Sequence, residues 1–161
     1  MKYISTRGHA PHLSFEDALL AGLATDGGLY VPESWPRLSE AMLRSFVGAD
    51  YATVAKAVLH PFMADDVSAE RLSEIVDEAY AGFSHKAVAP LVPLEEGHYL
   101  LELFHGPTLA FKDIAMQLLA RLMDDALQRR GQRATIVGAT SGDTGGAAIE
   151  AFKGRASVDI F

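Results

Sequence analysis

The sequence predicts an α/β protein in which a helical amino-terminal unit is followed by the start of a wound parallel sheet. Three observations lead to this prediction. Apolar residues recur every three or four positions over residues 1 to about 93, which is typical of helices. The pattern then changes to strand, helix, strand, helix, strand, the order of a parallel sheet with crossover helices. Pro90 and Pro93 bracket a stretch with few helix signals, so we expect two domains, 1–93 and 94–161.

The first unit is predicted to contain helices and one short strand. Ser14 is a helix-capping residue type, and it precedes a periodic segment that reaches Leu23. The tripeptide Asp26–Gly28 favours a turn into an extended run at 29–31. Further helices are predicted over residues 39–46, 52–59 and 68–83.

The second unit is predicted to alternate strands and helices. Residues 110–130 form its longest periodic segment, with an apolar stripe, and Gly131 stands where the helix should end. A glycine-rich turn at 140–146 precedes a helix that is predicted to begin at Ala147 and to reach Phe152. Strands are predicted over 99–104, 134–139 and 157–161. Because a parallel sheet normally needs more strands than these, we expect a truncated sheet whose open edge at 157–161 favours self-association.

Composition and charge exclude several function classes. With 14 Lys and Arg against 21 Asp and Glu, the net charge is -7, which is the wrong sign for a nucleic-acid-binding surface. The absence of cysteine excludes disulfides and thiolate catalysis, and the six scattered histidines predict no metal site. No apolar run has the length of a signal peptide or a membrane span, so a cytoplasmic location without membrane contact is expected.

One lysine stands at an unusual place in the second unit. Lys112 follows the end of a predicted strand and falls in the first turn of the predicted helix. The unpaired N–H groups of a first turn carry partial positive charge and disfavour a cation, and a broken local rule indicates function. An amine that is partly buried beside Phe111 suits nucleophilic attack on an aldehyde. The alternative is a solvated lysine paired with Asp113 or Asp124.

The glycine-rich turn is a candidate anion site. Residues Thr140–Gly146 lie between a predicted strand and a predicted helix, where backbone N–H groups and small hydroxyls converge on a carboxylate or phosphate. The glycine spacing fits neither the dinucleotide fingerprint nor the P-loop. The alternative is a tight turn that needs glycine for steric reasons alone.

Three long motifs resemble those of the threonine synthase family. The segment FHGPTLAFKD, residues 104–113, is similar to the family's cofactor-lysine motif, and ATSGDTGGAA, residues 139–148, looks like its loop for the substrate carboxylate. STRG at 5–8 and GLATDGGLYVPE at 22–33 are similar to its amino-terminal domain. In order and spacing, the resemblance covers nearly the whole chain. It implies the tryptophan-synthase β-type fold and pyridoxal 5'-phosphate as cofactor.

The resemblance also implies a reaction and residue roles. Threonine synthases, which serve threonine biosynthesis, convert O-phosphohomoserine and water to threonine and phosphate. Lys112 would form the internal aldimine, Phe111 would pack near the cofactor ring, and Asp143 would lie beside the cofactor. Contacts to the substrate carboxylate are expected from the rest of the loop, Ser141, Gly142, Thr144 and Gly145.

Other readings stay open at this point. A family member would need a further loop for the cofactor phosphate, so we expect this chain to be an amino-terminal fragment that is itself inactive. A related pyridoxal-phosphate lyase or dehydratase of the same fold is the nearest alternative, although the GLATDGGLYVPE segment argues against it. A non-catalytic interaction module of the same fold is another. Arg7 is read as an ordinary surface arginine rather than a helper for the substrate phosphate, and His105 as a loop histidine bonded to backbone.

Overall fold

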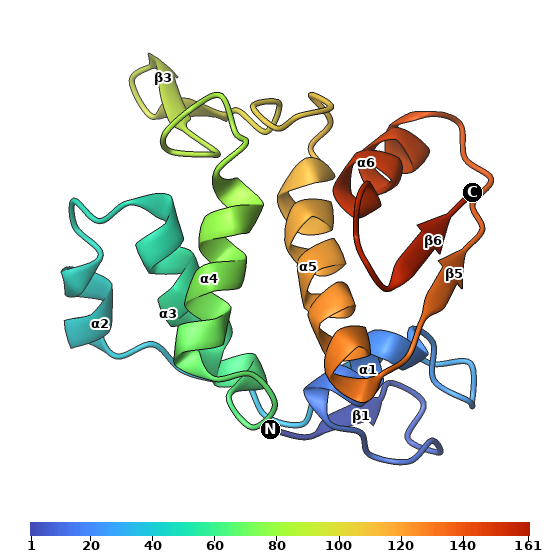
Figure 1. Ribbon diagram of the computed structural model, residues 1–161. Helices are drawn as coiled ribbons and strands as arrows, with labels where there is room; N and C mark the ends of the chain where they lie inside the picture. The colour runs from blue at the N-terminus through green and yellow to red at the C-terminus, as the bar shows by residue number, and fades with distance from the viewer. The chain divides into compact units, whose positions relative to one another are not determined.

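The computed structural model describes all residues from Met1 to Phe161. The chain divides into two compact units, Met1–Glu74 and Ile75–Phe161, each of which is described separately below (Figure 1). The first unit contains helices and one two-stranded sheet, and the second contains helices and two such sheets, so the predicted α/β class is confirmed. The domain boundary predicted near residue 93 stays a prediction.

The first unit opens with a short antiparallel pair of strands. Strand β1 (Tyr3–Ser5) pairs with β2 (Tyr30–Pro32), with Tyr3 opposite Pro32 and Ser5 opposite Tyr30. Helix α1 (Phe15–Ala21) lies between them in sequence. The Ser14 side chain accepts a hydrogen bond from the Asp17 N–H and so caps α1, as the sequence predicts.

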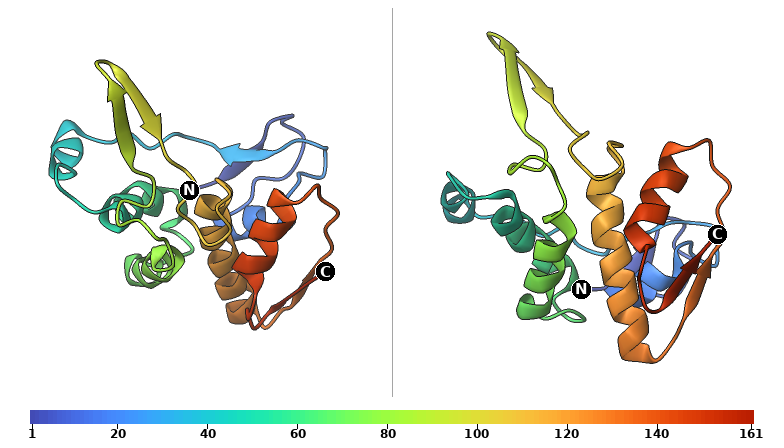
Figure 2. Two further views of the ribbon diagram at one scale, coloured as in Figure 1. Left: turned by 90° about the horizontal axis from the view of Figure 1, so that it is seen from above. Right: turned by 45° about the horizontal axis from the view of Figure 1, so that its top comes forward.

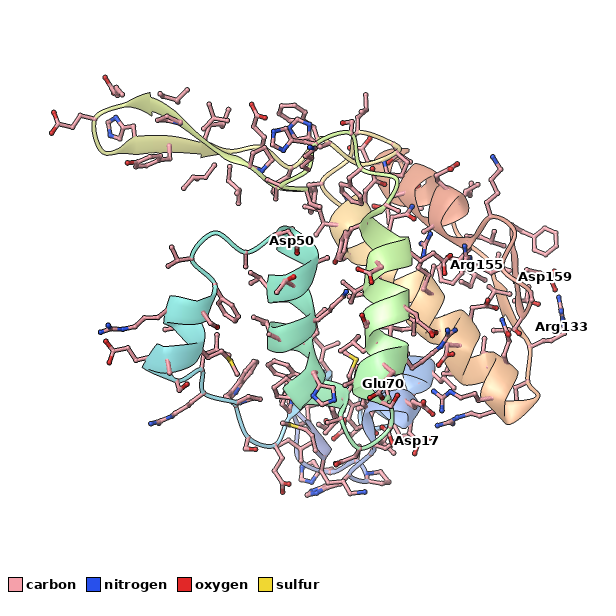
Figure 3. The ribbon with its side chains drawn as sticks, turned by 60° about the vertical axis from the view of Figure 1, so that its left-hand side comes forward. Asp17, Asp50, Glu70, Arg133, Arg155 and Asp159 are labelled. Atoms are coloured by element: carbon pink, nitrogen blue, oxygen red, sulfur yellow. The ribbon has the colours of Figure 1, made fainter.

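Two further helices of this unit also begin at side-chain caps. Ser39 caps α2 (Glu40–Ser45), and Asp50, labelled in Figure 3, caps α3 (Tyr51–Met63) through a 2.7 Å bond from the Thr53 N–H. Helix α3 continues past its predicted end at residue 59 and contains Pro61. A proline this close to the helix end removes only one backbone hydrogen bond, so the last turn persists.

Helix α4 (Ala69–Tyr80) begins in the first unit and ends in the second. The Ser68 hydroxyl accepts a bond from the Arg71 N–H at its start. One face of the helix is almost fully buried and carries Leu72, Ile75, Val76 and Ala79, which recur at helical spacing.

The second unit contains a hairpin that the sequence did not predict. Strand β3 (Leu91–Glu95) pairs antiparallel with β4 (His98–Leu101) across a turn in which Gly97 has a φ of +77°. The prediction that 99–104 is a strand of the parallel sheet is therefore wrong. Pro93, which was used to place the domain boundary, lies inside β3, and a proline is tolerated there because a two-stranded hairpin has only edge strands. The hairpin projects away from the helices of its unit (Figure 2).

The longest helix is α5 (Asp113–Arg130), which begins three residues later than predicted. It ends at Gly131, which has the left-handed conformation with φ 62° and ψ 30°. Its sequence carries five acidic and basic residues in addition to Asp113, namely Arg121, Asp124, Asp125, Arg129 and Arg130. No helix of the structure is both long and apolar enough to cross a membrane.

A parallel β-α-β arrangement completes the second unit. Strand β5 (Ala134–Ile136) pairs in parallel with β6 (Val158–Ile160), and helix α6 (Asp143–Phe152) connects them. Helix α6 packs against α5, and the buried residues at this part of the unit are mostly small. They include Ala120, Ala147 and Ala151, whose small side chains allow the two helices to approach closely.

Candidate functional site

The amino ends of α5 and α6 lie at the same end of the second unit. In Figures 1 and 2 both helices start at this end, and the arrowheads of β5 and β6 point toward it in Figure 1. Ligands of wound parallel sheets bind outside the carboxyl ends of the strands, where helix amino ends also gather. Both predicted segments, one ending in Lys112 and one at 140–146, are therefore brought to the edge of the fold that is suited to a ligand.

Lys112 occupies the N-cap position of α5, one residue before the first turn in which it was predicted. Its backbone is helical, with φ −65° and ψ −21°, and its side chain does not cap the helix. The Nζ atom lies 4.3 Å from the centroid of the Phe111 ring, and that ring is 59% exposed. Lys112 and Phe111 are thus adjacent, and the amine lies on an aromatic face at the start of a helix.

The two carboxylates proposed as alternative partners of Lys112 are bonded elsewhere. Asp113 is completely buried and accepts bonds from the Thr108 N–H at 2.8 Å and the Thr108 hydroxyl at 2.7 Å. Asp124 accepts a 2.8 Å bond from the Ser157 N–H. No ion pair joins Lys112 to either of them, so the reading of Lys112 as a paired surface lysine is not supported.

Asp113 fixes the loop that leads to Lys112. Gly106 lies so close to it that a Cβ at position 106 would come within 2.4 Å of the Asp113 Cβ, so only glycine fits there. Between them, Leu109 has a φ of +64°, an uncommon conformation for a residue with a branched side chain. Such backbone strain persists only where neighbouring contacts hold it, and it gathers at ligand sites. Asp113, Thr108 and Gly106 supply those contacts here.

The loop before α6 is organised around one hydroxyl. The Thr140 Oγ1 atom accepts bonds from the Gly142 N–H at 3.2 Å and from the Gly145 N–H at 3.0 Å. A Cβ on Gly145 would come within 2.6 Å of this oxygen, and Gly142 has a φ of +142°. Both glycines are therefore needed for steric reasons, as the alternative reading proposed. This need does not exclude a binding role, because the same packing shapes the loop.

Helix α6 begins at Asp143, four residues before its predicted start at Ala147. The second half of the glycine-rich turn is therefore the first helical turn. The N–H groups of Asp143 and Thr144 have no intrahelical acceptor, as is usual for a first turn, and they point to where an anion binds at a helix amino end. The side chains of Ser141, Asp143 and Thr144 are exposed, so this donor set is accessible to a ligand.

A pocket of about 350 Å³ lies beside this loop. Its wall is mainly apolar and includes Ile136, Ile149, Ile160 and Phe161. Polar groups enter it only from the loop, where Thr140, Thr144 and Gly145 line it. An apolar cavity with a few convergent polar groups is the usual form of a small-molecule site.

In the first unit, Asp26 joins the STRG and TDGG segments, a connection that the sequence did not reveal. Its carboxylate accepts bonds from the Ser5 hydroxyl at 2.7 Å and from the N–H groups of His9, Ala10 and Gly28. The Ser5 hydroxyl, aided by these N–H groups, lowers the pKa of Asp26 to about 2. Arg7 donates to the Asp26 carbonyl at 3.1 Å, so its guanidinium takes part in the same local structure.

His105 was predicted to be a loop histidine bonded to backbone. Its carbonyl accepts a 2.9 Å bond from the Ser84 N–H. Its ring, in contrast, contacts side chains: the Nε2 atom lies 2.7 Å from the Glu102 carboxylate, and the ring lies 5.0 Å from that of His85 at an angle of 42°. A carboxylate three residues earlier in a loop was the signal that could have indicated this pair.

Comparison with known proteins gives consistent results. The family model described as "Threonine synthase N terminus" matches residues 2–80. A threonine synthase of Pseudomonas aeruginosa is 56% identical over 161 residues, which are 100% of this chain and 34% of that protein. The crystal structure of PLP-bound threonine synthase from Brucella melitensis matches with 61% identity and a TM-score of 0.98, over 100% of this chain and 35% of that one. Threonine synthase from yeast matches with 38% identity and a TM-score of 0.93, over 99% of this chain and 34% of that one.

Over its whole length the chain is similar to threonine synthases. It spans about a third of the length of the threonine synthases that it matches. The region matched by the family model, 2–80, contains the STRG and TDGG segments that Asp26 joins. The candidate site residues lie outside that region, between Phe111 and Gly145.

Proposed function

We propose that the protein that carries this chain is a threonine synthase that converts O-phosphohomoserine and water to threonine and phosphate, with pyridoxal 5'-phosphate as its cofactor. The observation that carries the proposal is the position of Lys112 and of the Thr140–Gly146 loop at the amino ends of two packed helices. The high identity to named threonine synthases over the whole chain supports the same conclusion.

The residues present fit the parts of the cofactor that they would contact. Lys112 offers a primary amine that no carboxylate of the chain pairs with, and Phe111 offers an aromatic face next to it. The Thr140–Gly146 loop offers N–H groups at a helix amino end and a mainly apolar pocket at its side. An amine, a flat apolar surface and a cluster of donors are what an aldehyde on a planar ring requires.

Lys112 is the residue that would hold the cofactor covalently and move protons. When bound, pyridoxal phosphate supplies an electron sink for negative charge next to the substrate amino group. The reaction breaks the bond between the γ-carbon and the phosphate oxygen and adds a hydroxyl from water at the β-carbon. Its protons must leave and return on one face of the substrate, and the Lys112 Nζ would act as the base and acid on that face.

The loop before α6 would bind and orient the substrate carboxylate. The N–H groups of the first turn and the hydroxyls of Ser141 and Thr144 are donors, and Gly142 and Gly145 let the backbone approach closely. The side chain of Asp143 would repel a carboxylate, so its proposed role is to face the cofactor rather than the substrate. The N–H groups and hydroxyls of the loop would thus contact the substrate, and the Asp143 side chain would contact the cofactor.

Borohydride reduction of the full-length protein with pyridoxal phosphate tests the lysine. Peptide mass spectrometry should find the reduced pyridoxyl group on Lys112, and Lys112→Ala should lose turnover while its circular dichroism and unfolding midpoint are unchanged. Lys153→Ala, at the other end of α6, is the matched control and should keep both label and turnover. Label on another lysine in the wild-type protein would contradict the assignment of Lys112.

Product analysis tests the reaction. Release of phosphate together with threonine from O-phosphohomoserine supports the proposal, whereas turnover of serine or threonine to a keto acid would indicate a dehydratase. A protein that binds no cofactor and turns over none of these substrates would be a non-catalytic module. The expected inactivity of the 161-residue chain alone stays a prediction, and the same assay on that chain tests it.

A further inference from the structure

A second pocket, of about 390 Å³, lies in the unit formed by residues 75–161 and has several ionisable side chains in its wall. It is lined by the end of α4 with Gly82, by Pro107 of the loop before α5, by the first half of α5, and by residues around the carboxyl end of α6. The ionisable and amide side chains in its wall are Glu78, Gln117, Arg121, Glu150, Lys153 and Arg155. None of them belongs to the site proposed above, which lies at the opposite end of α6.

Two arginines share one carboxylate in this pocket. The Glu78 Oε1 atom lies 2.9 Å from an Nη atom of Arg155 and 3.1 Å from the Nε atom of Arg121. Glu78 is half exposed, whereas the side chains of Arg121 and Arg155 are only 12% and 21% exposed. Arg121 also donates to the backbone carbonyl and to the side-chain Oε1 of Gln117, both at 2.8 Å.

Three buried donors in the pocket wall have no acceptor. They are the Nε2 group of Gln117 and the Nε groups of Arg121 and Arg155. The Arg121 Nε lies 3.1 Å from the Glu78 carboxylate as an ion pair without a regular hydrogen bond, so of the three donors it is the one with a partner nearby. Gln117, which lines the pocket, is only 6% exposed, and its Oε1 already accepts from Arg121, so its amide hydrogens are left for another acceptor. Buried donors are nearly always satisfied, so three in one wall indicate a missing acceptor.

The charge of the wall favours an anion as that acceptor. Three cationic side chains, Arg121, Lys153 and Arg155, face two acidic ones, Glu78 and Glu150, in a chain whose total charge is -7. Burial lowers the pKa of Arg121, and the positive charge of Arg155 lowers it further, whereas the Glu78 carboxylate raises it. An added negative charge would offset the repulsion between the two guanidinium groups. Guanidinium forks and amide N–H groups together match the oxygens of a tetrahedral or planar oxyanion.

We propose that this pocket binds a small oxyanion, either a phosphate or a carboxylate group. The ligand would accept from the Nε groups of Arg121 and Arg155 and from the Gln117 amide. Glu78 keeps the two arginines in place, and its half-exposed position leaves the pocket open to solvent. Helix α6 has 10 residues, which corresponds to a length of roughly 15 Å. That length separates this pocket from the donors at the amino end of the helix.

Titration of inorganic phosphate into the isotope-labelled chain tests the proposal by nuclear magnetic resonance. At constant ionic strength, held with chloride, we expect saturable shifts of the Nε–H signals of Arg121 and Arg155 and of the Gln117 amide signal. The Nε–H signal of Arg133, whose exposed side chain pairs with Asp159 at the outer edge of the unit (Figure 3), should not move. Acetate, titrated in the same way, distinguishes a carboxylate source from a phosphate source, and saturation by either supports the site.

Matched variants complete the test. Arg121→Gln should lower the affinity of the pocket for the anion by about tenfold or more, as expected for the loss of a charged donor. Arg133→Gln should change this affinity by less than about twofold. If Arg121→Gln fails to fold, Arg155→Lys keeps the charge but removes an Nε donor, and it should still weaken binding. Equal shifts of all arginines, shifts only at the amides of residues 143 and 144, or no shift with either anion would overturn the proposal.

Discussion

Replacement of Asp113 by alanine tests whether this buried carboxylate holds the loop that carries Lys112. The side chain is fully buried and accepts two bonds from Thr108, at 2.8 and 2.7 Å. A hydrogen bond to a buried charged group contributes about 1.5–3 kcal/mol, but two bonds to one residue are not additive. Thr108 is itself half-buried and regains some water contacts. We therefore expect Asp113→Ala to lower the free energy of unfolding by about 2–4 kcal/mol.

The assay is urea unfolding, with Asp143→Ala as the matched control. Asp143 holds the equivalent first position of α6, but its side chain is exposed, so its removal should cost less than about 1 kcal/mol from the helix dipole. The midpoint should shift for Asp113→Ala without a change in the slope m, because the folded and unfolded surfaces stay similar. A double-mutant cycle with Thr108→Val should give a coupling energy above about 1 kcal/mol. Equal effects at positions 113 and 143, or no coupling with Thr108, would refute this account of the loop.

Three further predictions concern the loop before α6 and the Asp26 network. In the full-length protein, Ser141→Ala and Thr144→Val should weaken amino-acid binding more than cofactor binding, each by about tenfold, and cofactor loss with unchanged substrate affinity would reverse the assignment. Gly145→Ala should lower the free energy of unfolding by about 1–3 kcal/mol, because its Cβ would meet Thr140 at 2.6 Å, while Gly146→Ala, with nothing within 4 Å, should stabilise α6 slightly. The pKa of Asp26 is lowered to about 2, so its contribution to stability is present above its unfolded pKa of about 4 and is lost as the pH falls between these values. Chemical unfolding measured over that range should show a smaller pH dependence for Asp26→Asn than for wild type, and parallel curves would contradict the role of the network.

The sequence predicted best the features that depend on neighbouring residues. Ser14 caps α1 by accepting a bond from the N–H group three residues on, and Gly131 ends α5 in a left-handed conformation. Such signals lie within one helical turn, so tertiary context does not alter them. The same holds for Lys112 beside Phe111 and for the glycine-rich loop, whose members are close in sequence.

Features that depend on distant pairing were missed. In the hairpin of β3 and β4, Pro93 lies opposite Tyr99. The sequence of one strand does not show that the strand has a single partner, which is the condition under which a proline is tolerated. Asp26 collects donors from residues 16 to 21 positions away, including Ser5 and Ala10, and local turn signals explain only its bond to Gly28. The shared carboxylate of Glu78 joins arginines from α5 and from beyond α6, which no spacing rule indicates.

The sequence named the candidate site residues but not their geometry, and their roles stay predictions. That the amino ends of α5 and α6 lie at one end of the unit was seen only in the structure. The early start of α6 at Asp143 was not predicted, because Thr144 and two glycines have low helix propensity. Thr140 overrides that propensity by accepting the Gly145 N–H from outside the helix.

The bonds of Thr140 have a thermodynamic consequence for any ligand of this loop. Its hydroxyl holds the Gly142 and Gly145 N–H groups without a ligand, so the loop is already ordered when a carboxylate arrives. The conformational entropy of the loop is lost during folding and does not oppose binding. Calorimetry should therefore record a smaller unfavourable binding entropy for the wild-type loop than for Thr140→Ala, in which the same amides must be ordered at the moment of association.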